Sequence, residues 1–283
     1  MAVTDTLTRT RRITKVSRGL PTSDGAGVKL TRMLGHHGLM DLDPFLMLDQ
    51  IRSDDSADYM AGFPNHPHRG FETVTIMLDG KMRHGDNKGH AGVIEGGGIQ
   101  WMTAGRGIVH SELPEQDDGR LWGFQLWVNL PGALKMTDPA YQEFDKSEIP
   151  IEVRPGASLR VLAGSSSTGT IGPAKSVAIQ PTLIDVTLEP GAALEEAINP
   201  DHTAFIAVYK GSVSSGEDHV DDPDLGVLED GDRIELKAGP QGASLLLVAG
   251  KPINEPIARY GPFVMNTEAE LHQAVRDFQM GKF

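Results

Sequence analysis

Cysteine is absent from this sequence. Its absence excludes disulfide bonds, zinc sites built on thiolates and a cysteine nucleophile, so the chain places no demand on an oxidising compartment. Long apolar runs are also absent: none approaches the length that crosses a membrane, and residues 1–12 lack the apolar stretch of a secretory signal. These absences predict a cytoplasmic protein without a membrane contact.

Positive charge is scarce. The 26 lysine and arginine residues stand against 39 aspartate and glutamate residues, which gives a formal net charge of −13. Attraction to phosphate requires clustered cations, so we expect no direct binding to nucleic acid. One basic cluster is an exception, and a strand edge or a solvated tail explains such a cluster more often than a nucleic-acid arm does; it comprises Arg9, Arg11, Arg12, Lys15 and Arg18.

Helical patterns are few, whereas turn residues are plentiful. The chain has 33 glycines and 18 prolines, with short apolar runs between them, which is typical of short strands joined by tight turns. Strand-like runs occur at residues 73–78, 121–128, 204–209 and 244–248. The composition therefore predicts an all-β protein.

One helix is expected near the C-terminal end. Asn266 or Thr267 is a suitable N-cap, and Glu270 stands at capping-box spacing from Thr267. An apolar face follows, and Gly281 is expected to end the helix; that face consists of Leu271, Val275 and Phe278.

Histidines are concentrated in one part of the chain, and four residues there form a metal-ligand pattern. His66 and His68 are two residues apart, as are His110 and Glu112, and on a β-strand such pairs point to the same face. Three imidazoles and one carboxylate suit a divalent transition ion, and on an ion that prefers six ligands they leave two positions open. A closed tetrahedral zinc site would use the same four groups, so ligand type alone does not separate Fe(II), Mn, Ni, Cu and Zn.

A His-x-His pair taken alone is more often a pair of surface or hydrogen-bonded histidines than a metal site. The second pair with its carboxylate, beside glycine-rich turns, shifts the interpretation to metal binding. His84 and His90 lie between the two pairs, and we interpret them as turn or rim residues because the four-ligand set is complete without them.

The chain also contains an internal repeat. Residues 92–107 align with residues 226–242 when one insertion is allowed, which indicates two copies of one β-domain. The same offset carries His66 and His68 onto Ala197 and Asn199. It carries His110 and Glu112 onto Leu245 and Leu247, so the second copy lacks all four ligands. We therefore expect a filled, metal-free second barrel with a structural role.

A length of 283 residues accommodates two domains with sizeable cores. We expect a metal-binding domain over residues 1–135 and a metal-free domain with the terminal helix over residues 136–283. The Pro-rich and Ser/Gly-rich stretch at residues 131–181 is the junction region, and strands could be exchanged between the two domains.

Several long blocks resemble the pirin family of the cupin superfamily, in particular the quercetinase-type pirins. The blocks that carry the resemblance are residues 63–74, 100–112, 125–131, 250–256 and 260–267. This resemblance implies a bicupin, with two antiparallel β-barrels of jelly-roll type packed face to face and a short C-terminal helix. It also implies one iron, as Fe(II), in the N-terminal barrel, held by His66, His68, His110 and Glu112.

Glu72 requires a separate decision, because in many cupins the glutamate after His-x-His is itself a ligand. In pirins the carboxylate ligand is the one equivalent to Glu112. We therefore assign Glu72 a structural role, in which it holds a ligand imidazole by a hydrogen bond.

The resemblance implies an oxidoreductase, a quercetin 2,3-dioxygenase that opens a chelated flavonol with O2 and releases carbon monoxide. The partners would be a small aromatic chelator and O2, and Glu112 would either accept the hydroxyl proton or stay on the metal. The alternative is a redox-responsive iron-binding protein that acts on a transcription factor or a metabolic enzyme without turnover. The sequence leaves the natural substrate and any protein partner open.

Overall fold

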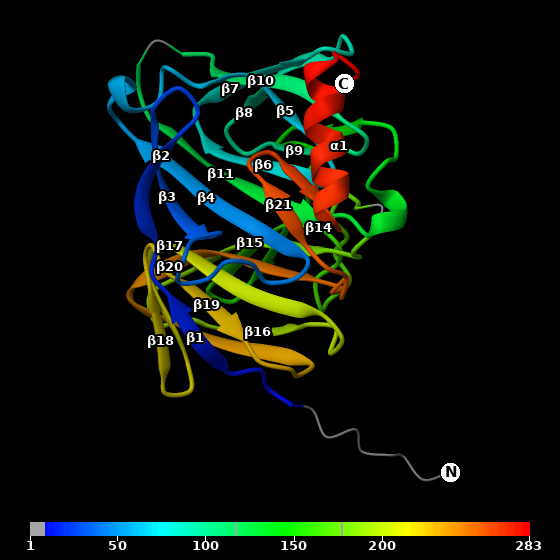
Figure 1. The fold of residues 1–283 in the computed structure, drawn as a ribbon. Coiled ribbons are helices and arrows are strands. Elements are labelled where there is room, and N and C mark those ends of the chain that lie inside the picture. The colour runs from blue at the N-terminus through cyan, green and yellow to red at the C-terminus, as the bar shows by residue number, and fades with distance from the viewer. Residues whose placement is uncertain (1–8, 117, 177) are drawn as a thin grey trace. The chain divides into compact units, whose positions relative to one another are not determined.

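The computed structural model describes residues 9–116, 118–176 and 178–283. The chain is built from antiparallel strands with one α-helix among the described residues, which confirms the all-β prediction (Figure 1). No helix in this described part is both long and apolar enough to span a membrane. Residues 1–8, part of the stretch that was inspected for a secretory signal, lie outside the described residues.

The described chain divides into two compact units, each made of three segments. Unit 1 comprises residues 9–18, 150–173 and 180–252, and unit 2 comprises residues 19–149, 174–179 and 253–283. Each unit therefore draws on segments from both ends of the chain. The boundary expected near residue 135 lies within unit 2.

Unit 1 contains a single sheet, in which seven strands run in the order β1-β19-β17-β20-β15-β14-β13 while β16 pairs with β20 and β18 with β17. Apolar side chains from β14, β15, β17 and β20 fill its core. The strands are β1 (Ile13–Ser17), β13 (Ile151–Arg154), β14 (Ala157–Ala163), β15 (Thr182–Leu188), β16 (Ala193–Ala197), β17 (Thr203–Ser215), β18 (Asp218–Asp221), β19 (Leu225–Leu228) and β20 (Arg233–Gly250).

The basic cluster near the N-terminus belongs in part to a strand edge, as expected. Strand β1 pairs with β19 at one edge of the sheet. Arg11 does not belong to a solvated tail, because its guanidinium is fully buried and donates hydrogen bonds to the carbonyls of Gly231 and His202. Five N–H donors let one arginine satisfy several buried carbonyls, which explains the buried position.

Unit 2 contains a seven-stranded sheet in the order β12-β9-β6-β11-β4-β3-β2 and a four-stranded sheet in the order β5-β10-β7-β8. Apolar residues from both sheets pack together in one core cluster. The strands are β2 (Leu20–Asp24), β3 (Val28–Leu34), β4 (Phe45–Ser53), β5 (Phe63–His68), β6 (Phe71–Asp79), β7 (Lys81–Asp86), β8 (Ala91–Glu95), β9 (Ile99–Thr103), β10 (Ile108–Pro114), β11 (Leu121–Asn129) and β12 (Ala140–Phe144).

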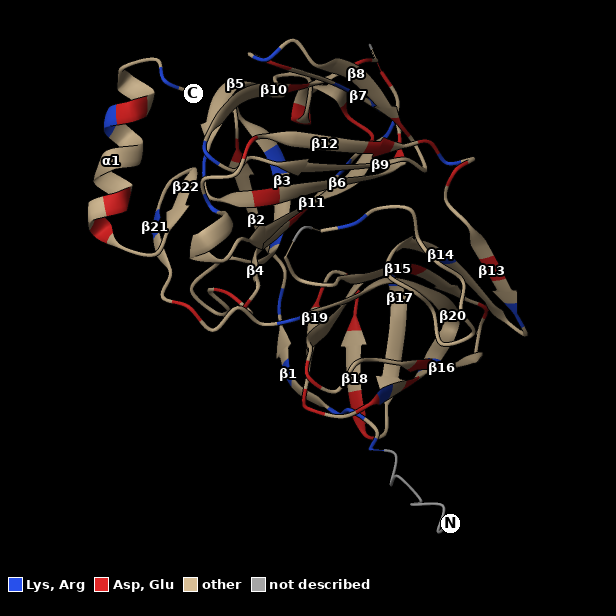
Figure 2. Cartoon of the chain, turned by 90° about the vertical axis from the view of Figure 1, so that its right-hand side faces the viewer, with Lys and Arg blue, Asp and Glu red and all other residues tan. Residues whose placement is uncertain are grey.

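The C-terminal segment of unit 2 adds a two-stranded sheet and a helix. Strands β21 (Ala258–Tyr260) and β22 (Phe263–Met265) pair with each other and lie beside helix α1 (Glu268–Gln279) (Figures 1 and 2). Thr267 and Glu270 form the predicted capping box, and Gly281 follows the helix with a φ of 67°. Two short 3-10 helices complete the unit, η1 (Ser56–Asp58) and η2 (Gly132–Leu134).

The strand pairings confirm a repeated topology but correct its register. Strand β6 pairs with β9 and β11, and the first half of β17 pairs in the same way with β19 and the second half of β20. Strand β10 pairs with β5 and β7, and its counterpart is therefore the first half of β20, which pairs with β16 and with the second half of β17.

The predicted equivalence of His110 and Glu112 with Leu245 and Leu247 is therefore wrong by one strand. The sequence alignment matches the turn between β8 and β9 with the turn between β19 and β20. The strand pairings instead make β19 the counterpart of β9. The expectation of a filled interior is nevertheless confirmed, because the strands that do correspond to β5 and β10 place Leu194, Ile234 and Leu236 in the apolar core.

Candidate metal centre

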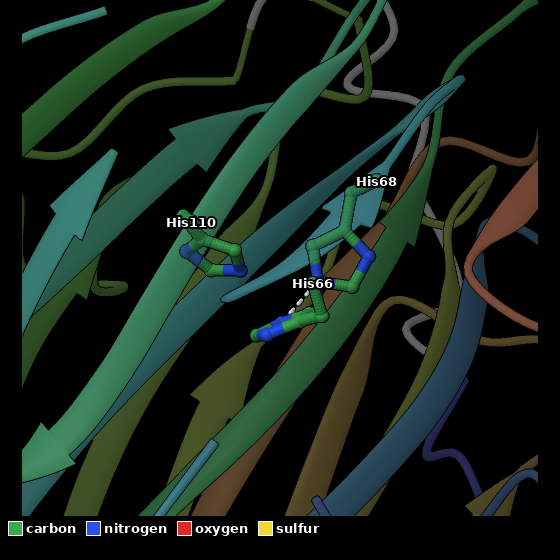
Figure 3. A group of neighbouring side chains, drawn as sticks. All are labelled: His66, His68 and His110. Carbon is green, nitrogen blue, oxygen red and sulfur yellow. Dashed lines mark hydrogen bonds between the residues drawn. The ribbon is translucent and has the colours of Figure 1, made fainter. Parts of the chain in front are cut away.

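Strands β5 and β10 bring three histidines together. The two strands are antiparallel, with His66 directly opposite His110 and His68 opposite Ile108. His66 and His68 share a face of β5, so all three rings converge, as Figure 3 shows. The ring centroids of His66 lie 4.7 Å from His68 and 4.4 Å from His110, and those of His68 and His110 are 4.9 Å apart.

Glycines at two turns allow this arrangement. Gly70, between β5 and β6, has a φ of 89°, and a Cβ there would lie 2.0 Å from the carbonyl oxygen of Val264. Gly107, just before β10, has a φ of 138°, and a Cβ there would lie 2.8 Å from the ring of Phe283. Only glycine fits such positions, which explains the glycine-rich sequence beside each histidine.

The spacing of the imidazole nitrogens fits a shared metal ion. One ligand nitrogen from each of the three histidines lies within 4.8 Å of the others, and the Nε2 atoms of His66 and His68 are 3.0 Å apart. Two nitrogens bound at a right angle to one ion at about 2.1 Å would be about 3.0 Å apart. The Nδ1 atom of His66 is 2.9 Å from the carbonyl oxygen of Pro64, a contact that leaves Nε2 directed to the centre.

Burial favours the neutral, metal-binding form of the His68 and His110 rings. His68 is 3% exposed and His110 is 1% exposed. Removal from water, together with the neighbouring histidines, lowers the pKa of both groups well below the usual value.

His110 also has buried polar atoms that a ligand could satisfy. Neither of its ring nitrogens has a hydrogen-bond partner among the described residues. Buried polar groups are usually paired, because an unpaired one costs about 1–3 kcal/mol. The convergence, the spacing and these unpaired nitrogens together make the three histidines suitable for holding a divalent metal ion.

Glu112 lies outside this group of three, although it lines the same cavity as His66 and His68. Its carboxylate accepts hydrogen bonds from Thr75 Oγ1 at 3.1 Å and from Gln125 Nε2 at 2.9 and 3.1 Å. The register between β5 and β10 shifts between His110 and Glu112, and such irregularities redirect side chains. The structure thus assembles three of the four expected ligands, and metal ligation by Glu112 stays a prediction.

The remaining histidines of this region have carboxylate partners. His84 Nε2 lies 2.8 Å from Glu143 Oε2, and His90 Nδ1 lies 2.9 Å from Asp86 Oδ2.

Glu72 is placed differently from the prediction. It is fully buried and accepts hydrogen bonds from Thr103 Oγ1 at 2.8 Å and Ser176 Oγ at 2.7 Å. Thr75 and Met77 of the same strand line the cavity, so Glu72 points to the opposite face of the sheet. The prediction that Glu72 holds a ligand imidazole is therefore wrong, because strand parity directs it away from the histidines.

His66 and His68 line one cavity of about 600 Å³ within unit 2, and the ring of His110 lies beside theirs. Apolar side chains from both sheets form much of its wall, including Leu30, Ile51, Met82 and Phe124. Polar residues that the sequence analysis did not select also line it, namely Arg32, Asp49, Thr75, Gln125 and Arg259. Gln125 could have been found from the strand-like run at 121–128, because side-chain alternation places it on the same face as Gly123 and Trp127.

The C-terminal segment supports the turn that follows His68. Arg69 Nη1 lies 2.9 Å from Asp277 Oδ2 of helix α1, and Arg69 Nε donates to the carbonyl oxygen of Arg106 at 2.5 Å. The guanidinium carbon also lies 4.3 Å from the ring centroid of Phe283. Lys135, which is buried, donates to the carbonyl oxygens of Gly70 at 2.8 Å and Val264 at 3.0 Å. These contacts fix the backbone on which His68 stands.

Replacing Gln125 by leucine is expected to change the centre without dismantling it. The variant removes the amide that donates to both oxygens of Glu112, and loss of such an outer partner typically costs about 10–100-fold in metal affinity or activity. Isothermal titration with Ni(II) measures the affinity. Gln142→Leu is a suitable control, because its amide bonds the backbone of Lys175 instead; equal affinities in all three proteins would contradict the role of Gln125.

Both halves of the chain are similar to known proteins. Residues 27–128 match the family model described as Pirin, and residues 183–283 match the one described as Pirin C-terminal cupin domain. A pirin-like protein of Caulobacter vibrioides is 53% identical over 274 residues, which cover 96% of this chain and 99% of that protein. Pirin of Homo sapiens is 40% identical, over 92% of this chain and 89% of that protein.

A solved structure has the same fold over nearly the whole chain. The crystal structure of a quercetin 2,3-dioxygenase from Acinetobacter baumannii superposes with a TM-score of 0.89 and is 33% identical in sequence. The match covers 97% of this chain and 99% of that one.

Proposed function

This chain belongs to the pirin family, and on that premise we propose that it is a metal-dependent dioxygenase. The proposed reaction is that of a quercetin 2,3-dioxygenase, in which a chelating flavonol reacts with O2, its ring opens and carbon monoxide is released. The activity named for the Acinetobacter baumannii relative supports this choice. Fe(II) is the proposed metal, and Mn, Ni, Cu and Zn are compatible with the same donors.

The observation that carries the proposal is the convergence of His66, His68 and His110, of which the first two line a cavity of about 600 Å³. Ligand pockets are typically about 300–1,000 Å³, with largely apolar walls and a few convergent polar groups. Three protein nitrogens leave coordination positions for an incoming chelator, which is the arrangement of a catalytic centre more than of a closed structural one.

The chain's own residues have separate tasks in this proposal. A bound divalent ion would lower the pKa of a chelating hydroxyl and polarise the adjacent carbonyl. In the proposed reaction Glu112 accepts the hydroxyl proton, and the hydrogen bonds from Gln125 and Thr75 to its carboxylate support this role. The apolar wall orients the aromatic rings and excludes water from the reacting atoms.

Turnover of quercetin tests the function directly. Protein stripped of metal and then loaded with Fe(II), Mn(II), Ni(II) or Cu(II) is supplied with quercetin and O2, and carbon monoxide is measured. We expect release only from metal-loaded protein. Tight metal binding without carbon monoxide from any flavonol would contradict a dioxygenase and favour the redox-responsive binding protein.

Glu112→Gln is expected to lower kcat for quercetin by at least about 100-fold, because a positioned general base typically contributes about 10²–10⁴-fold. The amide keeps the size of the side chain but accepts a proton poorly. Glu95→Gln is a suitable control, since Glu95 is exposed and pairs with Lys81. An unchanged kcat in Glu112→Gln, with metal content equal to that of the wild type, would exclude the proton-accepting role.

A further inference from the structure

Arg259 of β21 presents a cation at the wall of the cavity. Its guanidinium carbon lies 4.8 Å from the ring centroid of Trp127, so the indole face holds it in place. Its described hydrogen bonds are long: Nη1 donates to the carbonyl oxygen of Leu46 at 3.3 Å and Nη2 to the sulfur of Met47 at 3.9 Å. Arginine has five N–H donors, so this group retains capacity to bind an acceptor.

The carboxylates of the same wall are already engaged by a second arginine. Arg32 donates to Asp49 with Nε at 2.8 Å and Nη2 at 2.7 Å, and it donates to Asp24 at 2.9 Å. This bidentate geometry is the strong form of the arginine–carboxylate pair. Among the described charged residues of the cavity, Arg259 is therefore the cation whose charge is not matched by a carboxylate in direct contact.

Trp127 connects Arg259 to the candidate metal centre. Its ring centroid lies 5.2 Å from that of His68. The guanidinium carbon of Arg259 lies 4.8 Å from the Trp127 ring centroid, so it is at most about 10 Å from the ring centroid of His68. A small aromatic ligand that reached the histidines would therefore bring a substituent on its far edge close to Arg259.

The charge balance of the cavity also favours an anion. Arg32, Arg259, Asp24, Asp49 and Glu112 are its charged residues apart from the histidines, and a divalent ion at the histidines would make the total positive. The formal net charge of −13 for the whole chain therefore does not describe this cavity. Arg259 is exposed at this wall, so its guanidinium is accessible to a ligand that enters the cavity.

We propose that Arg259 determines substrate specificity by binding an anionic oxygen, a carboxylate or an acidic phenolate, on the edge of an aromatic chelator opposite its chelating pair. This inference deepens the proposed function and rests on it only for chelation at the three histidines. The substrate class is thus an anionic aromatic chelator. Arg259 acts by recognition and has no part in proton transfer.

Binding of two related probes isolates this effect without turnover. Nickel-loaded protein is titrated anaerobically with 3,4-dihydroxybenzoate and with catechol, which share the chelating pair and differ in the carboxylate. We expect the wild type to bind the acid at least about 10-fold more tightly. Arg259→Gln is expected to lower that preference by about 10-fold with the catechol and Ni(II) affinities unchanged, and Arg259→Lys is expected to keep part of it.

Arg52→Gln is the matched control. The guanidinium carbon of Arg52 lies 4.4 Å from the ring centroid of Trp122, so it reproduces the stacked arrangement, but Arg52 is not among the residues that line the cavity. This variant is expected to retain the full preference for the acid.

Three outcomes would overturn the proposal: a wild type without preference for the acid, an equal preference in Arg259→Gln, or no binding of either probe to nickel-loaded wild type. Carbon monoxide release from quercetin is measured separately on the same proteins. Absence of turnover together with the expected preference would contradict the dioxygenase function alone and leave the role of Arg259 standing.

Discussion

The double variant His66→Ala, His68→Ala is expected to lose at least about 1,000-fold in affinity for a divalent metal ion. It removes two of the three imidazoles that meet within 4.8 Å and leaves His110 as the remaining histidine of the group. The free energy of metal binding comes chiefly from the ligands themselves, so one imidazole cannot retain the ion. Carbon monoxide release from quercetin is expected to disappear with the metal.

Metal content by mass spectrometry and the thermal midpoint measure this loss together. An ion that binds the folded state alone stabilises it by about 2.7 kcal/mol at 100 times its Kd, so Ni(II) should raise the Tm of the wild type and leave that of the double variant unchanged. His219→Ala serves as the control, because His219 is an exposed residue of β18 paired with Asp221. Equal metal content in the double variant and the wild type would place the metal elsewhere.

Arg69→Met is expected to destabilise unit 2 by about 1–3 kcal/mol, because it removes the buried partner of the Asp277 carboxylate and leaves that carboxylate with the more exposed Lys282. The contact with the ring of Phe283 and the bond to the carbonyl oxygen of Arg106 are lost as well. Urea denaturation followed by tryptophan fluorescence measures the free energy of unfolding.

Arg106→Met provides the comparison. Arg106 pairs with Asp138 at 2.9 Å, but both side chains are mostly exposed, and such surface pairs contribute about 0–1 kcal/mol. A second variant, Arg69→Met with Asp277→Leu, should recover part of the loss because no buried charge remains. If Arg69→Met cost no more than Arg106→Met, the Arg69–Asp277 pair would have no structural importance.

The Arg69–Asp277 pair also makes the stability of unit 2 depend on pH in acid. Hydrogen bonding to Arg69 lowers the pKa of Asp277 to about 2. A carboxylate with a depressed pKa in the folded state contributes its full stabilisation above its usual pKa, and it loses this contribution as the pH falls toward 2. In Asp277→Asn this part of the acid dependence should disappear.

Local sequence patterns predicted the parts of this molecule that depend on local geometry. The alternation of side chains on a strand placed His66 and His68 on one face, and the capping box at Thr267 located the helix. Both rules involve residues fewer than five positions apart. They therefore hold whatever the rest of the chain does.

Features that depend on strand pairing were not predictable in this way. The repeat was recognised, but its alignment matched turns that join different strand pairs, because glycine-rich turns resemble one another wherever they occur. Arg69 contacts Asp277, which is 208 positions away in the sequence. Arg259 lines the cavity from a strand that is far from the histidines in the sequence. Glu72 was also misplaced, because the turn at Gly70 separates it from His68, and side-chain alternation within one strand does not continue across a turn into the next strand.

The segment order of unit 2 has a consequence for biosynthesis. The ribosome makes residues 19–149, with all three histidines, well before residues 253–283, and two of the three segments of unit 1 are translated in between. Until that last stretch emerges, the nascent chain has neither Asp277 for Arg69 nor the Val264 carbonyl for Lys135. Because domains of a growing chain tend to fold in order of synthesis, we expect the histidines to acquire metal only after translation is nearly complete, so loading would be a late step of maturation.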